Sequence, residues 1–338
     1  MTTDEGRDMS APFPDVGTIR TALSLAIRAP STRNSQPWRW RIGADSLHLY
    51  ANPARDPQDV DLARRDLIVS CGGALNHCAT GLAALGWQPT IHRFPDPADS
   101  SHLAVIEVAP YLASGPDFAL AAAIPRRRTD RRHYSAWPVA HSDIALMGAR
   151  AARAGIALRR VEMSPALRAA VAQAIWPHVS DLDYSGGSAA GSGRGTSPAG
   201  AAALDTPESD PAAALSGRGS GDPALAQPPE TTAQDDDAVL IALGTLVDDD
   251  LARLRAGEAT SIVLLTATAL GLASCLASQP LEIPEIREAI REDVFGSTGF
   301  PQMLLRVGWA PFTADPLPAT PRRELSDVVD RLDGAPIT

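Results

Sequence analysis

Apolar side chains recur along this chain at two spacings, which together predict a mixture of helices and strands. Spacings of three or four positions place apolar groups on one face of a helix and occur at residues 15–28, 59–85, 117–124, 142–154, 164–175, 258–272 and 284–291. Alternation of apolar and polar residues is typical of half-buried strands and occurs at residues 38–42, 46–51, 88–94, 102–109, 156–162 and 302–309.

The two long helices predicted at 59–85 and 258–272 carry matching small residues. A shift of 185 positions places Gly72 on Gly257 and also superimposes several neighbouring residues. Glycine inside a helix costs about 1 kcal/mol relative to alanine, so these positions indicate the close approach of another backbone or of a ligand. A duplication would give two α+β halves that pack on each other as an internal pseudo-dimer.

We divide the chain into two halves and identify one segment of biased composition. We assign residues 15–124 to the first half and 125–338 to the second, with residues 1–14 as a disordered N-terminus. Residues 185–232 are dominated by Gly, Ala, Ser and Pro and contain no aromatic residue. Such a segment cannot bury enough apolar area to offset its ordering entropy, so we expect a disordered insert in the second half.

Charge and composition restrict the classes of function. The net charge is −10, which disfavours a nucleic-acid partner. All 30 basic residues are arginine, which excludes chemistry that needs a lysine and leaves arginines or backbone amides to hold an anion. The apolar run at 262–273 is too short to span a membrane, and the acidic N-terminus is unlike a signal peptide. We therefore expect a soluble cytoplasmic protein without a membrane partner.

The cysteines and histidines show no pattern of a metal centre. Cys71 and Cys78 share one face of a predicted helix and are too far apart for a disulfide. We expect these two and Cys275 to be buried small hydrophobes in a reducing cytoplasm. The histidines lack the spacing of metal ligands, so neither a metal site nor a catalytic side chain is predicted.

Segment 29–40, APSTRNSQPWRW, is the most distinctive part of the chain. Pro30 and Pro37 stiffen its backbone, short polar side chains lie between them, and two tryptophans follow. Hydrogen-bonding groups held between fixed ends and anchored by tryptophan are suited to gripping a planar heteroaromatic ligand. A plain polar turn that joins a helix to a strand would explain the same residues.

This segment resembles the flavin-contacting loop of the nitroreductase-like flavoproteins, which carries A-P-S-x-x-N-x-Q-P-W after a helix. The chain is most similar to the Acg-type actinobacterial branch, in which two nitroreductase-like halves are fused. The resemblance implies antiparallel or mixed sheets flanked by helices, and an internal pseudo-dimer that is complete as a monomer. It also implies an FMN cofactor, contacted in this part of the chain by Arg28, Pro30, Ser31, Thr32, Asn34 and Gln36.

Three further segments fit the resemblance. RRRTDRR at 126–132 resembles the phosphate motif R-x-[ST]-x-[RK], and the tail at 321–330 resembles the C-terminal arginine segment of the family. GLASCLASQ at 271–279 resembles the segment beside the flavin N5, with serine in place of a usual glycine. The resemblance implies cofactor contacts from Arg127, Arg128, Thr129, Arg131, Ser278, Gln279, Arg322 and Arg323.

Each of these segments also has a plainer interpretation. The basic segment and the tail could be solvated surface, and 271–279 could include a core strand or a bend. Arginines are costly to bury unpaired, so several arginine segments would converge only around an anion.

Three functions compete on this basis. In the first, an FMN-dependent oxidoreductase takes hydride from NAD(P)H and reduces a nitroaromatic, a quinone or a similar small molecule, with the flavin carrying the chemistry. In the second, the protein stores or senses FMN under a lid from the insert, with Trp176, Leu182 and Tyr184 as plugs. In the third, the basic segment binds an anionic partner, which the net charge disfavours.

Overall fold

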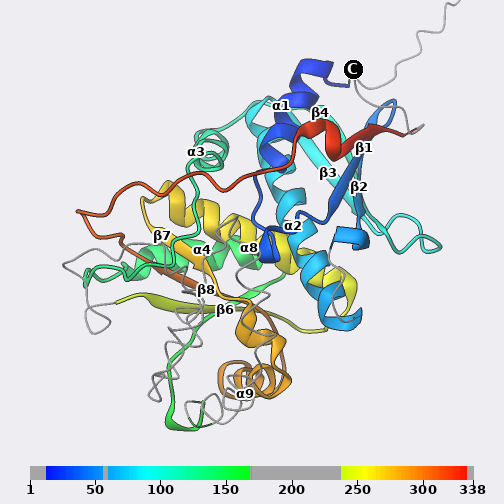
Figure 1. Ribbon diagram of the computed structural model, residues 1–338. Coiled ribbons are helices and arrows are strands. Elements are labelled where there is room, and N and C mark those ends of the chain that lie inside the picture. Colours follow the sequence, from blue (N-terminus) through cyan, green and yellow to red (C-terminus); the bar gives the residue numbers. More distant parts are fainter. Residues whose placement is uncertain (1–12, 56–59, 168, 170–236, 333–338) are drawn as a thin grey trace, which may run out of the picture.

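The computed structural model describes residues 13–55, 60–167, 169 and 237–332 (Figure 1). The predicted insert at 185–232 and the proposed plugs Trp176, Leu182 and Tyr184 lie outside these residues, as do the first twelve residues of the chain.

The first half contains four strands that pair antiparallel in the order β3-β4-β2-β1, with helices α1 and α2 packed on each other. Its elements are α1 (Val16–Ala26), η1 (Thr32–Asn34), β1 (Trp38–Ile42), β2 (Ser46–Ala51), η2 (Pro53–Arg55), α2 (Val60–Ala84), β3 (Trp87–Arg93), β4 (His102–Pro110) and α3 (Gly115–Ala123). Asp15 caps α1 by accepting a hydrogen bond of 3.0 Å from the Thr18 N–H, as its position in the sequence predicts.

The second half repeats the plan. Its elements are α4 (His141–Arg153), β5 (Ala157–Arg160), β6 (Val239–Thr245), α8 (Asp250–Ala269), β7 (Ala273–Leu276), η5 (Gln279–Glu282), α9 (Pro284–Phe295), β8 (Phe300–Gly308), η6 (Leu325–Asp327) and β9 (Val329–Arg331). Segment 271–279 is therefore partly a strand, which ends at Leu276, and Ser278 and Gln279 lie at the start of a 3-10 helix.

The two sheets share one topology. The first has the strand order β3-β4-β2-β1-β9 and the second β7-β8-β6-β5, written here from the matching end. The irregularity in register also recurs, between Leu49 and Tyr50 in β2 and between Leu243 and Gly244 in β6. Equal strand orders with equivalent bulges confirm two similar α+β halves.

The halves meet where α2 and α8 cross at the two glycines that the sequence repeat superimposes. A Cβ atom on Gly72 would lie 2.1 Å from the Leu254 carbonyl oxygen, and one on Gly257 would lie 2.0 Å from the Val69 carbonyl oxygen. Each glycine also lies against the Cα atom of the other. Because residues 185 positions apart touch each other, the pseudo-twofold axis passes between these helices.

Polar contacts extend the seam between the halves beyond the glycines. The Ser261 hydroxyl on α8 donates to Asn76 Oδ1 on α2 at 2.7 Å, and these positions are again 185 apart. Arg93, at the end of β3, donates to both carboxylate oxygens of Glu258 at 2.7 Å. Glu258 is buried, so this bidentate pair fixes the first sheet to α8.

The C-terminal segment returns to the first half. Beyond β8, the orange-to-red segment in Figure 1 runs across the molecule, and β9 pairs in parallel with β1 through Trp40 and Val329. Residues 329–331 therefore belong to the first sheet, although we had placed all of 125–338 in the second half. The pairing was missed because three residues carry no alternation pattern and their partner is remote in sequence.

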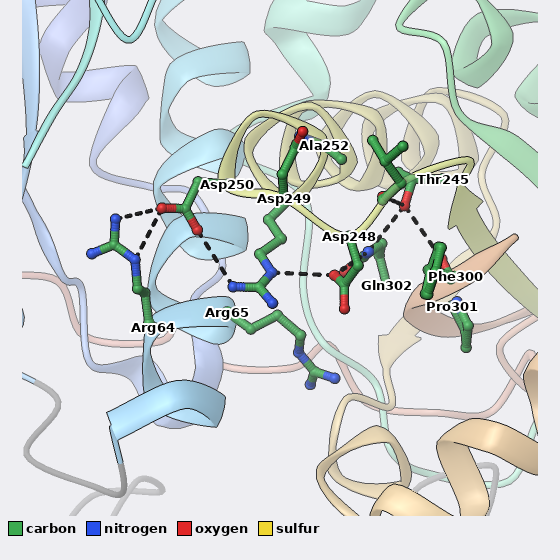
Figure 2. Close-up of polar contacts among 12 residues, drawn as sticks. Arg64, Arg65, Thr245, Asp248, Asp249, Asp250, Ala252, Phe300, Pro301 and Gln302 are labelled. Carbon is green, nitrogen blue, oxygen red and sulfur yellow. Dashed lines mark hydrogen bonds and ion pairs between the residues drawn. The ribbon is translucent and has the colours of Figure 1, made fainter. Parts of the chain in front are cut away.

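Helix α8 begins at Asp250, eight positions before the start predicted at 258. The Asp249 side chain caps it by accepting from the Ala252 N–H at 2.8 Å. The neighbouring Asp248 accepts from Arg253 Nε at 3.2 Å and from Gln302 Nε2 at 2.9 Å, and Figure 2 shows Asp248 beside Gln302. The acidic residues 248–250 thus form the start of α8 and connect it to β8. The sequence pattern does not indicate this start, because the first turns of α8 are not strongly apolar.

Trp38 and Trp40 are fully buried in the hydrophobic core of the first half. They therefore anchor β1, and with it the end of the preceding loop, to that core. Within the described residues, one helical stretch, Arg64–Ala84 in α2, is long and apolar enough to cross a membrane. Its burial of 72% in the protein is typical of a core helix.

We predict that Gly72→Ala lowers the free energy of unfolding by about 2 kcal/mol or more, because the new methyl group meets backbone that cannot move locally. Gly148→Ala is the matched control, since its Cβ would lie 4.0 Å from Leu158 in an ordinary contact on α4. That control should gain about 0.5–1 kcal/mol from helix propensity. Urea unfolding measures both, and equal effects would contradict a close helix crossing.

We also predict an acid-sensitive stabilisation from Asp248. Burial alone raises the pKa of this carboxyl, but hydrogen bonds from Gln302 and Arg253 and the charge of Arg287 outweigh it and lower the pKa to about 2. The stabilisation is therefore full above the unfolded value of 3.8 and is lost as pH falls through about 2.

Asp248→Asn should lower the free energy of unfolding by about 2 kcal/mol at neutral pH. It should also make that free energy less dependent on pH in the acid range. Asp237→Asn, at an exposed position, is the control. Denaturant titrations between neutral and acid pH test the difference, and parallel curves for the wild type and Asp248→Asn would refute the assignment.

Candidate functional site

The loop between α1 and β1 has an unusual backbone. Arg33, Asn34 and Gln36 have φ angles of 51°, 55° and 51°, and only Phe94 and Ser297 share such a conformation among the other described non-glycine residues. Left-handed backbone is costly for residues with a Cβ atom, especially arginine and glutamine. Three such residues in one short loop persist only if the surroundings hold them, which is typical of functional sites.

Contacts to both halves hold this loop. The Gln36 N–H donates to Ser31 Oγ at 3.0 Å within the loop, and the Thr32 N–H donates to Ser70 Oγ on α2 at 3.2 Å. Arg33 forms an ion pair of 2.6 Å with Glu282 on η5. The polar turn is therefore a fixed element at the seam.

The C-terminal tail closes over the same loop. Asn34 Nδ2 donates to the Pro321 carbonyl at 3.2 Å, and Arg322 Nη1 donates to Asn34 Oδ1 at 3.1 Å. Arg322 Nη2 also donates to the Arg28 carbonyl at 3.2 Å, and the Arg323 N–H donates to Gln36 Oε1 at 2.9 Å. Segments almost 290 positions apart thus meet, as the sequence resemblance implies.

Four guanidinium groups, from Arg28, Arg127, Arg128 and Arg322, gather beneath the loop and form what we term the arginine cluster. Burial, followed by the charges of Arg322 and Arg128, lowers the pKa of Arg127 to about 9. Burial and the charges of Arg28 and Arg128 lower the pKa of Arg322 to about 10. Within the described residues, none of the four forms an ion pair with a carboxylate, so like charges are held together uncompensated.

Neutral contacts orient the cluster. Arg127 Nη1 donates to the Thr129 hydroxyl at 3.3 Å, while Arg128 donates to the Pro125 carbonyl at 2.8 Å and to the Leu317 carbonyl at 3.3 Å. The Nε atoms of Arg127 and Arg322 are buried and have no partner in the described part of the chain. Donors without acceptors beside unpaired positive charge are suited to holding an anion.

Other predicted residues lie at the edge of the cluster or outside it. The guanidinium of Arg323 donates to the Asp327 carbonyl at 2.6 Å, on a different side from Arg322. The charge of Arg131 acts on the buried thiol of Cys275. Ser278 and Gln279 begin η5, which reaches the loop through the ion pair between Arg33 and Glu282. Arg132, which was not predicted, pairs with Asp130 at 2.9 Å.

Helix α2 contacts the loop from within the first half. The Ser70 hydroxyl accepts from the Thr32 N–H, and Gly73 lies beside the loop, since a Cβ there would be in ordinary contact, 3.6 Å, with the Pro30 carbonyl oxygen. One turn further along, His77 is fully buried. Burial, followed by the charges of Arg127, Arg322 and Arg28, lowers the pKa of His77 to about 3.

Sequence reasoning missed Ser70 and His77, which carry no motif. The available signal was their spacing from Gly73, because residues 70, 73 and 77 share one face of a helix. In the part of the chain that the structure describes, no group of three or more His, Cys, Asp or Glu side chains is arranged to hold a metal ion.

Comparison with known proteins identifies relatives along nearly the whole chain. "Putative NAD(P)H nitroreductase Rv3131" of Mycobacterium tuberculosis H37Rv is 56% identical over 322 residues, which cover 95% of this chain and 94% of the relative. "Putative NAD(P)H nitroreductase acg" of the same strain is 31% identical over 324 residues, covering 92% of this chain and 94% of the relative. No family model matches the chain.

One solved structure supports the fold. The crystal structure of a putative nitroreductase from Anabaena variabilis superposes with a TM-score of 0.54 at 9% identity, covering 89% of this chain and 90% of that chain. The likeness confirms a nitroreductase-like α+β architecture across both halves.

We predict that Arg127→Met stabilises the ligand-free protein by on the order of 1 kcal/mol, because it removes a buried charge that its neighbours repel. The same change should abolish the thermal stabilisation of the protein by inorganic phosphate. Arg20→Met, at an exposed position on α1, is the control and should alter neither quantity. Thermal melts with and without phosphate decide the matter, and a less stable variant that still responds to phosphate would argue against an anion site.

Proposed function

We propose a function on the premise that the chain belongs to the NAD(P)H nitroreductase family of its mycobacterial relatives. The protein binds one FMN at the seam and transfers electrons from NAD(P)H to a small-molecule acceptor such as a nitroaromatic or a quinone. The arginine cluster carries this proposal, because it supplies buried, uncompensated positive charge where the strained loop and the tail meet.

The residues present fit the phosphate group of FMN. At neutral pH this group is largely a dianion, which accepts hydrogen bonds from several guanidinium groups at once. Arg127, Arg128 and Arg322 would hold it, and Thr129 orients Arg127 through their 3.3 Å hydrogen bond. The charge of the ligand would relieve the repulsion that lowers the pKa values of Arg127 and Arg322.

The loop would bind the opposite end of the cofactor. Ser31, Thr32, Asn34 and Gln36 offer short donors and acceptors on a backbone that Glu282 and Ser70 hold in place. Such groups suit the polar edge of a flavin ring, whose redox chemistry would carry the hydride transfer. Ser278 and Gln279 on η5 are the second-half candidates for the same edge. The protein side chains orient the reactants, and none is assigned a covalent role.

The pseudo-twofold axis would generate a second site, but the equivalent position lacks its loop. In the first half, residues 27–37 connect α1 to β1. In the second half, only residues 154–156 connect α4 to β5, through a tight turn at Gly155. The tail that covers the loop also occurs once per chain. We therefore infer one cofactor per chain and a protein that is complete as a monomer.

The alternative of FMN storage differs in one measurable property. If the site excludes nicotinamide, FMN is bound but stays oxidised when NADPH or NADH is added anaerobically. For the oxidoreductase we expect the purified protein to be yellow, to release FMN on denaturation, and to bleach with one of the two nucleotides. An unchanged spectrum would favour storage, and a protein that cannot take up FMN would end both proposals.

We predict that Arg322→Gln weakens FMN binding by roughly 30-fold, which corresponds to about 2 kcal/mol for a lost charged hydrogen bond in a buried site. Arg323→Gln should have a smaller effect, because its guanidinium lies outside the cluster. Fluorescence titration of the FMN-free protein measures both dissociation constants. Equal, small effects at the two positions would remove the arginine cluster from the cofactor site.

A further inference from the structure

His77 has one nitrogen satisfied and one unsatisfied although its side chain is fully buried. Nδ1 lies 3.1 Å from the Gly73 carbonyl oxygen and 2.8 Å from Ser261 Oγ. Nε2 is buried and has no partner among the described residues. A buried polar atom without a partner costs free energy, so its retention calls for an explanation.

The contacts of Nδ1 define the tautomer. The Gly73 carbonyl can only accept a hydrogen bond, and the Ser261 hydroxyl already donates to Asn76 Oδ1 at 2.7 Å. Both neighbours of Nδ1 therefore require a donor, which places the single proton of the neutral ring on Nδ1. Nε2 consequently presents a lone pair and can only accept a hydrogen bond.

This acceptor belongs to the site described above. Ser70, Gly73 and His77 lie on one face of α2, and the first two contact the start of the loop. The charges that act on His77 are those of Arg127, Arg322 and Arg28, three members of the arginine cluster. Two of these arginines have buried Nε donors that also lack partners. On this face of α2 the unused acceptor of His77 is therefore accompanied by unused arginine donors.

This combination selects among ligands. A doubly ionised phosphate monoester group, or a sulfate ion, can satisfy the arginine donors, but it has no hydrogen to give to a lone pair and would be repelled by it. A phosphorylated polyol supplies both, since its phosphate accepts while an adjacent hydroxyl donates. We propose that His77 is a positioning residue whose Nε2 accepts a hydrogen bond from a hydroxyl of the ribityl chain of FMN. The inference rests on the proposed function and deepens it, because it makes His77 the residue that distinguishes a sugar-alcohol phosphate from an anion without a hydroxyl group.

Nitrogen-15 NMR of the histidine-labelled full chain tests the contact without altering the protein. The His77 signals are identified by their loss in His77→Gln. We expect the Nδ1 proton to be retained throughout, and the Nε2 resonance to move toward the hydrogen-bonded position when FMN is added. Sulfate, a dianion that has no hydrogen to donate, should leave it in place when added at saturation. An unmoved Nε2 resonance in a sample that has bound FMN overturns the inference, as does an equal shift with sulfate alone.

Binding measurements provide a second test. His77→Phe removes the acceptor and should weaken FMN binding about tenfold while leaving sulfate binding unchanged. His77→Gln offers an amide oxygen and should restore part of the loss, and His92→Gln on the exposed edge of the first sheet is the control. Equal losses for FMN and sulfate would indicate a merely structural role. Failure of the wild type to bind FMN would instead refute the proposed function, so the two failures are distinguishable.

Discussion

The close crossing of α2 and α8 is the constraint on which the rest of the structure depends. Each of the two glycines at the crossing touches backbone of the opposite helix, so neither tolerates a side chain without separating the halves. Because the crossing lies on the pseudo-twofold axis, it sets the position of both sheets at once. It also brings Ser70, Gly73 and His77 of one helix to the surface on which the loop and the arginines gather.

The site combines a loop in a fixed conformation with electrostatic repulsion among buried arginines. The loop is held in left-handed backbone by an ion pair to η5 and by hydrogen bonds to α2 and to the C-terminal tail. The arginine cluster stores repulsion that folding alone does not relieve, and its neighbours supply only neutral acceptors. Stability sacrificed at such a position is typical of a binding site that is organised before its ligand arrives. The cytoplasmic location and the identity of the electron acceptor stay predictions.

Local sequence patterns predicted much of the fold because most helices and outer strands have one buried face. β1 and β2 begin and end at the predicted residues. β6 was not recognised as a strand, since it is buried along nearly its whole length and so lacks alternation. For the site, the motif resemblance identified the loop, Arg127 and Arg322. The resemblance could not show which of Arg322 and Arg323 lies in the arginine cluster, because long-range contacts determine where each side chain of the tail lies.

The parallel pairing of β9 with β1 also fixes the order of events during biosynthesis. The loop and its supporting helix are synthesised early, whereas the arginine that bonds Asn34 and the strand that fastens the tail are made only after β8. The arginine cluster is therefore incomplete on a nascent chain until Arg322 has been added. A chain that stopped after β8 would contain every described strand except β9, yet it would lack the residues that cover the loop.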